Sequence, residues 1–199
     1  SGHGNREVFT FSFWVKRAKL GTVQLVLYIR SGPGNVGRVM FDASDRLDVE
    51  SEISGSAVAK KVTSAKFRDC SAWQHFVIKF DAVNTNCDIY HNGVELTDFD
   101  TNTEPTNVDH YFGGDFQHYI GGFADSSTVD GYLAEVHYID GSALDESSFG
   151  QFDSNSVWQP KQYSGTYGTN GFHLDFSDNT STTTIAEDSS GNNNDFTPY

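Results

Sequence analysis

The stretch Gly131–Phe149, GYLAEVHYIDGSALDESSF, decides the fold of this chain. Its first half alternates between two sets of side chains, with Ala134, Val136 and Tyr138 on one face and Leu133, Glu135 and His137 on the other. Alternation with a period of two is typical of a half-buried β-strand. Asp140-Gly141 ends that strand, and Ser142–Phe149 predicts a short helical turn capped by Ser142.

The N-terminal stretch Val8–Lys16, VFTFSFWVK, shows the same alternation. Its inward row is predicted to be Phe9, Phe11, Phe13 and Val15, whereas Trp14 lies on the polar face. Two interpretations of Trp14 stay open on the sequence alone. Either a loop covers its ring, or the ring is an exposed platform for a ligand.

Shorter alternating runs predict the other strands, which are Thr22–Arg30, Arg38–Ala43, Arg46–Glu50, Ala57–Thr63, Trp73–Asp81, Asn86–Asn92 and His118–Gly122. Ser44-Asp45 and Asn92-Gly93 are predicted to be tight turns. Thr97–Gln117 is predicted to be a long polar loop, of the kind that often carries function. Because no segment shows a helical stripe and aromatic residues are abundant, we expect an all-β protein.

The chain divides into two parts by composition. Residues 1–150 are predicted to form one domain, and residues 151–199 a C-terminal extension rich in Gly, Asn and Tyr that packs on it. One strand is predicted in the extension, at Gly171–Phe176. The opening letters SGHGNRE lead us to expect a piece of a longer protein.

The two cysteines are predicted to be free thiols. In the hairpin formed by Trp73–Asp81 and Asn86–Asn92, Cys87 faces a residue near Phe80 and not Cys70. The Cα atoms of the two cysteines would then lie beyond the ~7 Å limit for a disulfide.

The charge balance excludes some partners. The chain has 27 acidic and 13 basic residues and a net charge of −14. Binding to nucleic acid or to an anionic membrane needs clustered Lys and Arg, so we expect neither, and no run is long enough to insert in a membrane. The acidic surface is compatible with cation binding, although simple solvation explains it as well.

Four segments in this order resemble the LamG-like, concanavalin A-type jelly roll, and they are FTFSFWVKR, WQHFVIKFD, DIYHNGVEL and YIGGFADSSTVDGYLAEVHYIDGSAL. They are spread over about residues 8–150. The resemblance implies a two-sheet antiparallel jelly-roll sandwich, with the extension as an irregular addition. It also implies a binding or structural module, because the superfamily includes many lectins as well as glucanases.

The C-terminal part has a resemblance of its own. The pattern of Phe152–Tyr199, with GFHLDFSDN and DSSGNNNDFTP, is similar to segments of marine bacteriophage structural proteins. This implies a component of a tail fibre, spike or capsid surface, located on the virion or outside the cell. Its partners would be a cell-surface glycan or other virion proteins, and a purely structural role as an oligomerisation or capsid-decoration domain is the alternative.

No catalytic motif is evident, so we expect a protein without enzymatic activity. Retaining glycosidases need two carboxyl groups about 5–5.5 Å apart. Glu135 and Asp140 are five residues apart and face opposite sides of a regular strand. Asp48, Glu50 and Glu52 do alternate, but we interpret them as a solvated strand face without an aromatic platform nearby. A glycoside hydrolase or lyase with a less evident acid pair remains the alternative.

Aromatic and polar side chains that could bind a glycan occur on one sheet face, on the long loop and in the extension. The candidates are Trp14, His75, Tyr111, Phe112, Asp115, His118, His137 and Trp158. Aromatic packing under surface loops is the competing interpretation for each of them.

Calcium is the metal that the sequence favours, because oxygen ligands are plentiful in the loops. The candidate ligands are Asp115, Asp125, Asp130, Asp188 and Asn192. The competing interpretation is that these Asx residues cap their own backbone turns. The seven histidines are scattered without helical pairing, so a transition-metal site is not expected.

Overall fold

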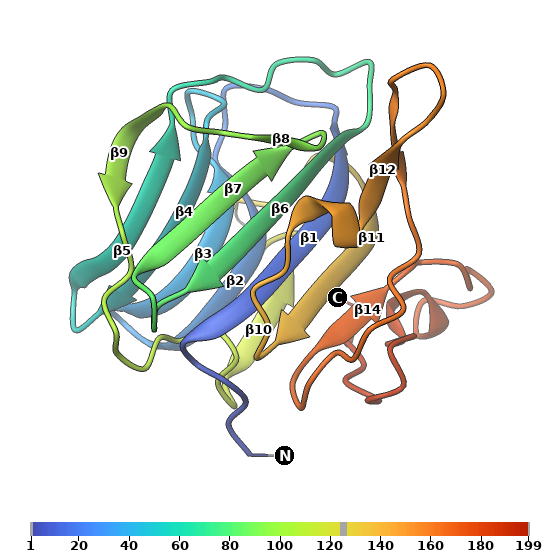
Figure 1. Cartoon of the computed structure of the whole chain (residues 1–199). Coiled ribbons are helices and arrows are strands. Elements are labelled where there is room, and N and C mark those ends of the chain that lie inside the picture. Colours follow the sequence, from blue (N-terminus) through green and yellow to red (C-terminus); the bar gives the residue numbers. More distant parts are fainter. Residues whose placement is uncertain (1, 124–126, 199) are drawn as a thin grey trace.

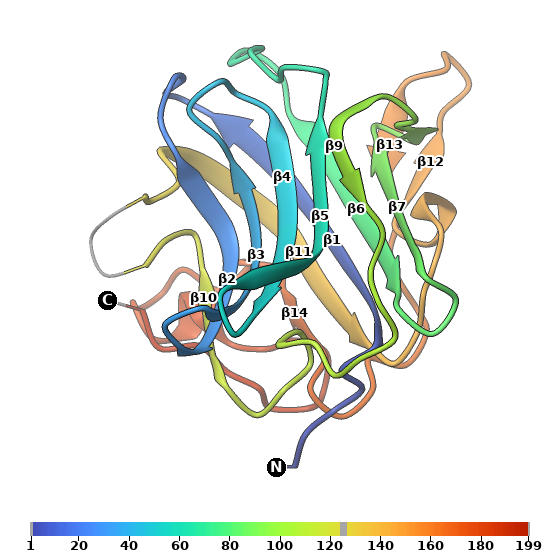
Figure 2. The ribbon, with the colours of Figure 1, turned by 90° about the vertical axis from the view of Figure 1, so that its left-hand side faces the viewer.

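Two antiparallel sheets of six strands each pack face to face in the computed structural model, which describes residues 2–123 and 127–198 (Figure 1). Sheet A has the order β14-β11-β1-β6-β7-β8, and sheet B has the order β10-β2-β3-β4-β5-β9 (Figure 2). A separate two-stranded hairpin, β12-β13, lies beside sheet A. This architecture confirms the predicted all-β jelly-roll sandwich.

The strands of sheet A are β1 (Val8–Arg17), β6 (Gln74–Asp81), β7 (Asn86–His91), β8 (Val94–Glu95), β11 (Gly131–Asp140) and β14 (Phe172–Leu174). The strands of sheet B are β2 (Gln24–Gly32), β3 (Asn35–Phe41), β4 (Leu47–Ile53), β5 (Ser56–Thr63), β9 (Phe99–Thr103) and β10 (Gln117–Ile120). The hairpin consists of β12 (Gly150–Phe152) and β13 (Trp158–Pro160), and two short 3-10 helices are η1 (Glu146–Ser148) and η2 (Thr184–Ala186). No helix among the described residues is long and apolar enough to cross a membrane.

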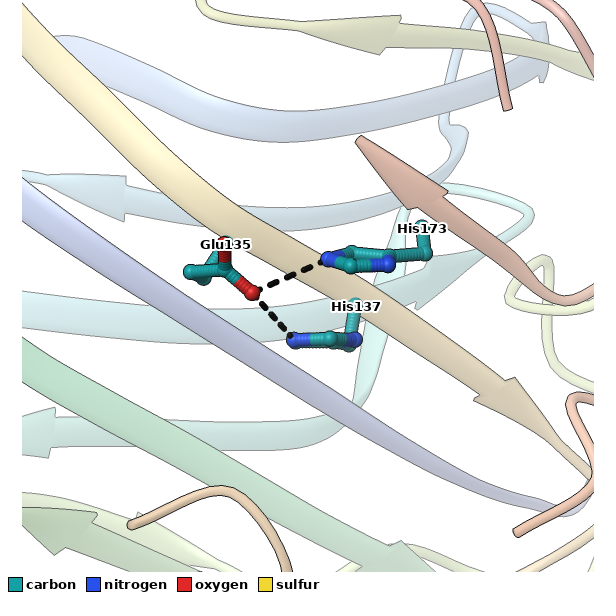
Figure 3. A group of neighbouring side chains, drawn as sticks. All are labelled: Glu135, His137 and His173. Carbon is teal, nitrogen blue, oxygen red and sulfur yellow. Dashed lines mark hydrogen bonds and ion pairs between the residues drawn. The ribbon is translucent and has the colours of Figure 1, made fainter. Parts of the chain in front are cut away.

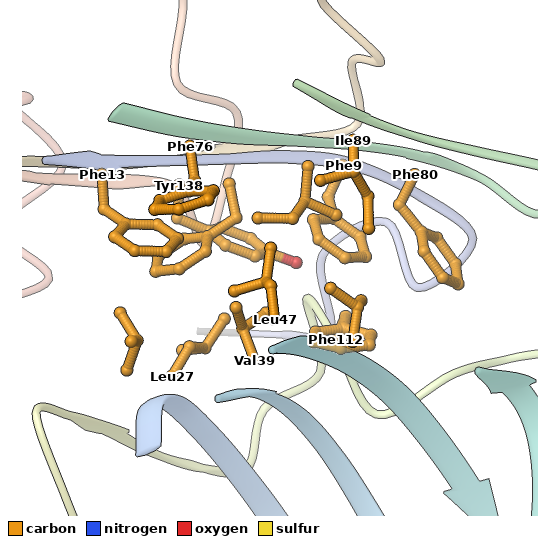
Figure 4. Packing of buried hydrophobic residues seen from close by; sticks show 14 of the residues in the cluster. Phe9, Phe13, Leu27, Val39, Leu47, Phe76, Phe80, Ile89, Phe112 and Tyr138 are labelled. Carbon is orange, nitrogen blue, oxygen red and sulfur yellow. The ribbon is translucent and has the colours of Figure 1, made fainter. Parts of the chain in front are cut away.

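The core between the sheets is aromatic on the side of sheet A. The predicted row of β1 is buried there, and the rings of Phe9 and Phe80 stack at 4.8 Å (Figure 4). Leu27, Val39 and Leu47 meet them from sheet B. Burying one such side chain stabilises the fold by about 1.5–3 kcal/mol, so the alternation of β1 is sufficient to orient the whole sheet.

Two predictions about the loops are wrong in part. The segment Thr97–Gln117 contains a strand, β9, which pairs with β5 at the edge of sheet B. Apart from Phe99, which packs against the core, its residues are polar, because an edge strand needs backbone pairing more than a buried row. The helical turn near Ser142 is shorter than predicted, with Asp145 at its N-cap position and no side-chain capping bond.

The hairpin of β6 and β7 follows the predicted register. Phe80 lies opposite Cys87, and both cysteines are free. Cys87 is buried, whereas Cys70 is partly exposed.

A β-bulge interrupts β11. Ser12 of β1 lies opposite His137 and Trp14 lies opposite Ala134, so β11 contains one extra residue between these pairs. Glu135 adopts a positive φ of 47°, which marks it as the bulged residue. Leu133 therefore packs against the core with Val136 and Tyr138, and the predicted placement of Ala134 on the same face as Val136 and Tyr138 is wrong.

Candidate functional site

The outer face of sheet A is covered by the chain that follows β11. Val77, Tyr90, Ile139 and Phe149 form a second buried cluster there, and Tyr163 and Tyr167 pack on it. In Figure 1 the segment containing η1 and β12 crosses in front of β1 and β11. This part of sheet A is therefore not an open binding face.

Trp14, His75 and Trp158 form one stack under this cover. The ring centroids of Trp14 and His75 are 4.7 Å apart, and those of His75 and Trp158 are 6.0 Å apart. Trp14 is 8% exposed and His75 is 1% exposed, so these two glycan candidates are packing residues. The burial of Trp14 decides between the two interpretations of this residue, because its ring is covered and is not an exposed platform. Trp158 itself is only half-buried.

Two more glycan candidates are buried. Phe112 is 0% exposed and packs on Phe9 and Phe80 in the core. His137 is 2% exposed, and its Nδ1 atom lies 3.0 Å from the hydroxyl of Tyr167. The polar loop that contains Phe112 suggests exposure, but the ring reaches back between the sheets. Neither side chain is placed to stack on a sugar.

The remaining loop candidates lie at an open edge of the sandwich. A cleft of about 820 Å³ separates β10, the edge strand of sheet B, from β14, the edge strand of sheet A. We call it the edge cleft. Half-buried aromatic rings line it, and these are Phe116, Tyr119, Phe176 and Phe196. Asp115 and His118 line it as well, whereas Tyr111 packs behind it on Phe116.

Polar groups complete the edge cleft. Asn170 and Asn194 of the extension line it, and their side-chain amides donate to the carbonyls of Gly113 and Gly171, respectively. His118 Nδ1 lies 2.8 Å from the Phe116 carbonyl, while its Nε2 is buried without a hydrogen-bond partner among the described residues. Burial lowers the pKa of His118, so this imidazole is neutral at pH 7. The cleft thus combines aromatic faces with neutral hydrogen-bonding groups and with the exposed carboxylates of Asp115 and Asp195.

The outer face of sheet B carries a row of charged side chains. Arg38, Glu50 and Lys60 lie opposite one another on β3, β4 and β5. Lys60 Nζ lies 3.0 Å from Glu50 Oε2 and 3.5 Å from Asp48 Oδ2, and Arg38 also pairs with Glu50. Asp48 and Glu50 are each 5% exposed, and burial raises the pKa of Asp48. The predicted solvated strand face is therefore wrong, because the ion pairs cover these carboxylates.

An aromatic group adjoins that row, which also corrects the prediction. Tyr28 lies opposite Arg38, and its ring packs near those of Tyr119 and Phe123. Tyr119 belongs to both surfaces, since it also lines the edge cleft.

The four candidate calcium ligands that the structure describes do not form one group. Asp115 lines the edge cleft, Asp130 is exposed just before β11, and Asp125 lies outside the described residues. Both carboxylate oxygens of Asp188 accept hydrogen bonds, from the amides of His173 and Ser190 and from the Ser190 hydroxyl and the Asn194 amide.

Asn192 has the same kind of role. Its side-chain amide donates to the carbonyls of Gly168 and Gly171 at 2.7 and 2.9 Å. Asp188 therefore caps its own turn through Ser190 and Asn194, as the capping interpretation predicts. Asn192 does not, because it joins its turn to the segment before β14.

A group that the sequence did not reveal lies where β14 meets β11. Glu135 Oε2 is 3.0 Å from His173 Nε2 and 3.5 Å from His137 Nε2 (Figure 3). The two imidazole rings stack with centroids 4.0 Å apart. His137 and His173 are directly opposed in the β11–β14 pairing, and only that pairing joins residues so distant in the chain.

Comparisons with known proteins agree with this architecture. The profile of the Concanavalin A-like lectin/glucanases superfamily, Laminin_G_3, matches residues 3–148. A search of curated proteins found no sequence match.

Solved structures with a similar fold include a Bacteroides ovatus protein provisionally named a carbohydrate binding protein. It is 16% identical, with a TM-score of 0.61, and the match covers 89% of this chain and 48% of that one. The Ruminococcus gnavus IT-sialidase CBM40 is 15% identical with a TM-score of 0.49, over 71% of this chain and 80% of that one. Domain 4 of AbnA, a GH43 extracellular arabinanase from Geobacillus stearothermophilus solved with arabinotriose, is 18% identical with a TM-score of 0.46, over 72% and 65%.

The matched profile spans most of the chain and includes every strand of the two sheets except β14. The chain therefore belongs to the concanavalin A-like lectin/glucanases superfamily.

Proposed function

We propose that this protein is a non-catalytic recognition module that binds carbohydrate in the edge cleft. The observation that carries the proposal is the lining of that cleft, where half-buried aromatic rings stand beside polar side chains that include amides and carboxylates. Sugars stack their CH faces on aromatic rings and exchange hydrogen bonds with such neighbours, and the volume of about 820 Å³ is in the range of ligand sites. The fold shared with the Bacteroides ovatus protein supports the same class of ligand.

A glycan-array screen of the intact chain, with calcium and with a chelator, tests the proposal. We expect one or more glycans to bind, and the Tyr119→Ala variant to weaken that binding about tenfold through the loss of a stacking ring. Tyr132→Ala is the matched control, because Tyr132 is 64% exposed and does not line the cleft. Absence of binding in both conditions refutes carbohydrate recognition, and equal loss in both variants refutes the cleft as its site.

For the biological setting we propose the surface of a virion, outside the cell. The support is the resemblance of residues 152–199 to marine bacteriophage structural proteins. The ligand would then be a glycan on the host surface, and calcium would act, if bound, at the acidic loops next to the cleft.

A glycoside hydrolase is the second candidate, and the buried carboxylates of β4 favour it. Asp48 and Glu50 share one face of the strand, and burial raises the pKa of Asp48, as in a general acid. Their ion pairs with Lys60 and Arg38 instead favour a structural role. Release of reducing ends from a panel of β-glucans, abolished by Glu50→Gln, would establish the enzyme and overturn the non-catalytic proposal.

Self-association is the third candidate, and the tip of the β12-β13 hairpin favours it. Phe152 and Val157 are 53% and 51% exposed there. Exposed apolar side chains that cluster often mark an interface. Light scattering of the wild type and of a Phe152→Ser, Val157→Ser double variant tests this, since only the variant would be monomeric.

A further inference from the structure

The group formed by Glu135, His137 and His173 has the composition of a transition-metal site. Two imidazole nitrogens and one carboxylate oxygen, one from each residue, all lie within 4.8 Å of one another. Ligand atoms held at about 2.0–2.2 Å from a zinc ion are separated by little more than 3 Å, so small side-chain movements suffice. Figure 3 shows both Nε2 atoms directed at the same carboxylate oxygen.

The opposite nitrogen of each imidazole is held by a hydroxyl group. Tyr167 Oη lies 3.0 Å from His137 Nδ1, and Ser189 Oγ lies 2.9 Å from His173 Nδ1. Metal-ligating histidines usually have such a partner, which fixes the ring orientation. A hydroxyl can donate or accept, so each imidazole can carry its proton on Nε2 without a metal and on Nδ1 with one. Metal binding to the two neutral imidazoles then requires no net release of protons to solvent.

The strained backbone at Glu135 is a second, independent indication of a metal site. A positive φ at a non-glycine residue costs of order 1–3 kcal/mol and is typically kept where a side chain must be aimed. The bulge at Glu135 has φ 47° and places its carboxylate next to His137 on the outer face of sheet A. A regular strand would offer the same histidine pair without this distortion.

The site is accessible from one side. The side chain of Glu135 is 39% exposed, that of His173 is 16% exposed, and that of His137 is 3% exposed. An ion can therefore enter past Glu135 and keep water in its remaining coordination positions. Imidazole ligands favour zinc and similar transition metals over calcium, which prefers oxygen alone.

We propose that Glu135, His137 and His173 bind one divalent transition-metal ion, which clasps β14 to β11. Glu135 and His137 belong to the region matched by the family profile, whereas His173 lies in the C-terminal extension. The ion would thus fix the extension to the sandwich. This inference is independent of carbohydrate binding, because His173 lies on the opposite face of β14 from the cleft-lining Phe172 and Leu174.

Zinc titration of the chelator-treated, intact chain tests the proposal, with a chromophoric competitor as the readout. We expect one Zn²⁺ per wild-type chain, at least tenfold weaker binding for His173→Ala and for Glu135→Gln, and up to about tenfold weakening for Tyr167→Phe. His3→Ala is the matched control, since His3 is exposed and contacts Asp115 and Phe116 instead of this group. Ca²⁺ should not compete.

A second measurement tests whether the ion holds β14 against β11. Zn²⁺ should slow amide hydrogen exchange at residues 172–174 in the wild type and in His3→Ala, but not in His173→Ala. The proposal is overturned if the wild type binds no zinc saturably, or if His173→Ala and Glu135→Gln bind it as tightly as the wild type. Glu135→Gln preserves the size of the side chain, so the comparison stands even if His173→Ala is unstable.

Discussion

The indole Nε1 of Trp158 donates a hydrogen bond of 2.9 Å to Nδ1 of His75. Because Nδ1 is the acceptor, the proton of the neutral imidazole is on Nε2, which lies 2.8 Å from Ser12 Oγ and donates to it. One histidine thus links β1, β6 and the β12-β13 hairpin. Its protonation would remove the acceptor for Trp158 and weaken the cover over sheet A.

We predict that acid destabilises the protein through His75. Burial, with smaller repulsion from His137 and His91, lowers the pKa of His75 to about 3 from 6.5. The unfolded chain takes up this proton near pH 6.5 and the folded chain only near pH 3, so stability is lost as the pH falls between these values. The contribution is at most about 1.4 kcal/mol per pH unit.

Urea unfolding at pH 7 and pH 5, followed by circular dichroism, measures this effect. His75→Gln should show a shallower dependence of the unfolding free energy on pH than the wild type. His3→Ala, which removes an exposed histidine, should keep the wild-type dependence. Identical pH dependence in His75→Gln and the wild type would contradict the prediction.

The packing of Trp158 on Gly150 gives a second prediction. A Cβ atom at Gly150 would lie 2.2 Å from Trp158 Cζ2, so Gly150→Ala must displace the indole ring. Overpacking of this kind costs about 1–3 kcal/mol. In a Trp158→Ala background the same substitution should cost little, and a double-mutant cycle in urea would measure the coupling. Gly32→Ala, where no atom lies within 4 Å, is the control that should be near neutral.

Much of the sandwich was predictable from alternation, because a buried row such as Phe9, Phe11 and Phe13 leaves a period of two in the sequence. The edge strand β9 left no such mark, since neither of its faces is fully buried. The bulge at Glu135 was not predictable either. An extra residue in a strand changes the facing of its neighbours without changing the residue types.

The candidate sites were less predictable for a related reason. Trp14, His75 and Phe112 have the residue types of a sugar platform, but whether a ring is covered depends on segments distant in the chain. The group of Glu135, His137 and His173 exists only because β14 pairs with β11. The edge cleft likewise lies between two strands that are remote in sequence, and only Asp115 and His118 of its lining residues were candidates.

A buried ion pair at the end of β1 provides a third prediction. Arg17 and Asp45 are 3.0 Å apart, and their side chains are 1% and 3% exposed. Asp45→Asn leaves the guanidinium of Arg17 without its countercharge and should reduce the unfolding free energy by about 3–5 kcal/mol. The matched control is Asp109→Asn, which breaks a pair whose carboxylate is 70% exposed and should cost at most about 1 kcal/mol. If Asp45→Asn and Asp109→Asn had equal urea unfolding midpoints, the predicted difference between the buried and the exposed ion pair would be wrong.

The two thiols should differ in reactivity. Burial raises the pKa of Cys87 to about 12, so almost no thiolate forms there at pH 8, whereas Cys70 is partly exposed. We expect Ellman's reagent to label one thiol per native chain and two in denaturant. Cys70→Ser should remove the native signal, and Cys87→Ser should leave it. A native signal that survives Cys70→Ser would mean that the β6–β7 hairpin opens on the time scale of labelling.

The wall of the edge cleft should depend on Asp188, which is not itself part of the lining. Its carboxylate accepts hydrogen bonds from His173, Ser190 and Asn194 and so holds the chain between η2 and Phe196, whose ring packs on Phe172 at 4.9 Å. Asp188→Ala removes all of these acceptors at once.

We therefore expect Asp188→Ala to speed hydrogen exchange over residues 186–196 while the core strands keep their protection, because the core between the two sheets does not contain Asp188. Any glycan bound in the cleft should then bind more weakly, since Phe196 and Asn194 are no longer held in place. Asp178→Ala is the control, as Asp178 forms only local bonds with Thr180 and Thr184 in an exposed turn. If both variants exchange alike, Asp188 does not anchor this segment, and the cleft wall must be held by its other contacts, which are the packing of Phe196 and the side-chain amides of Asn192 and Asn194.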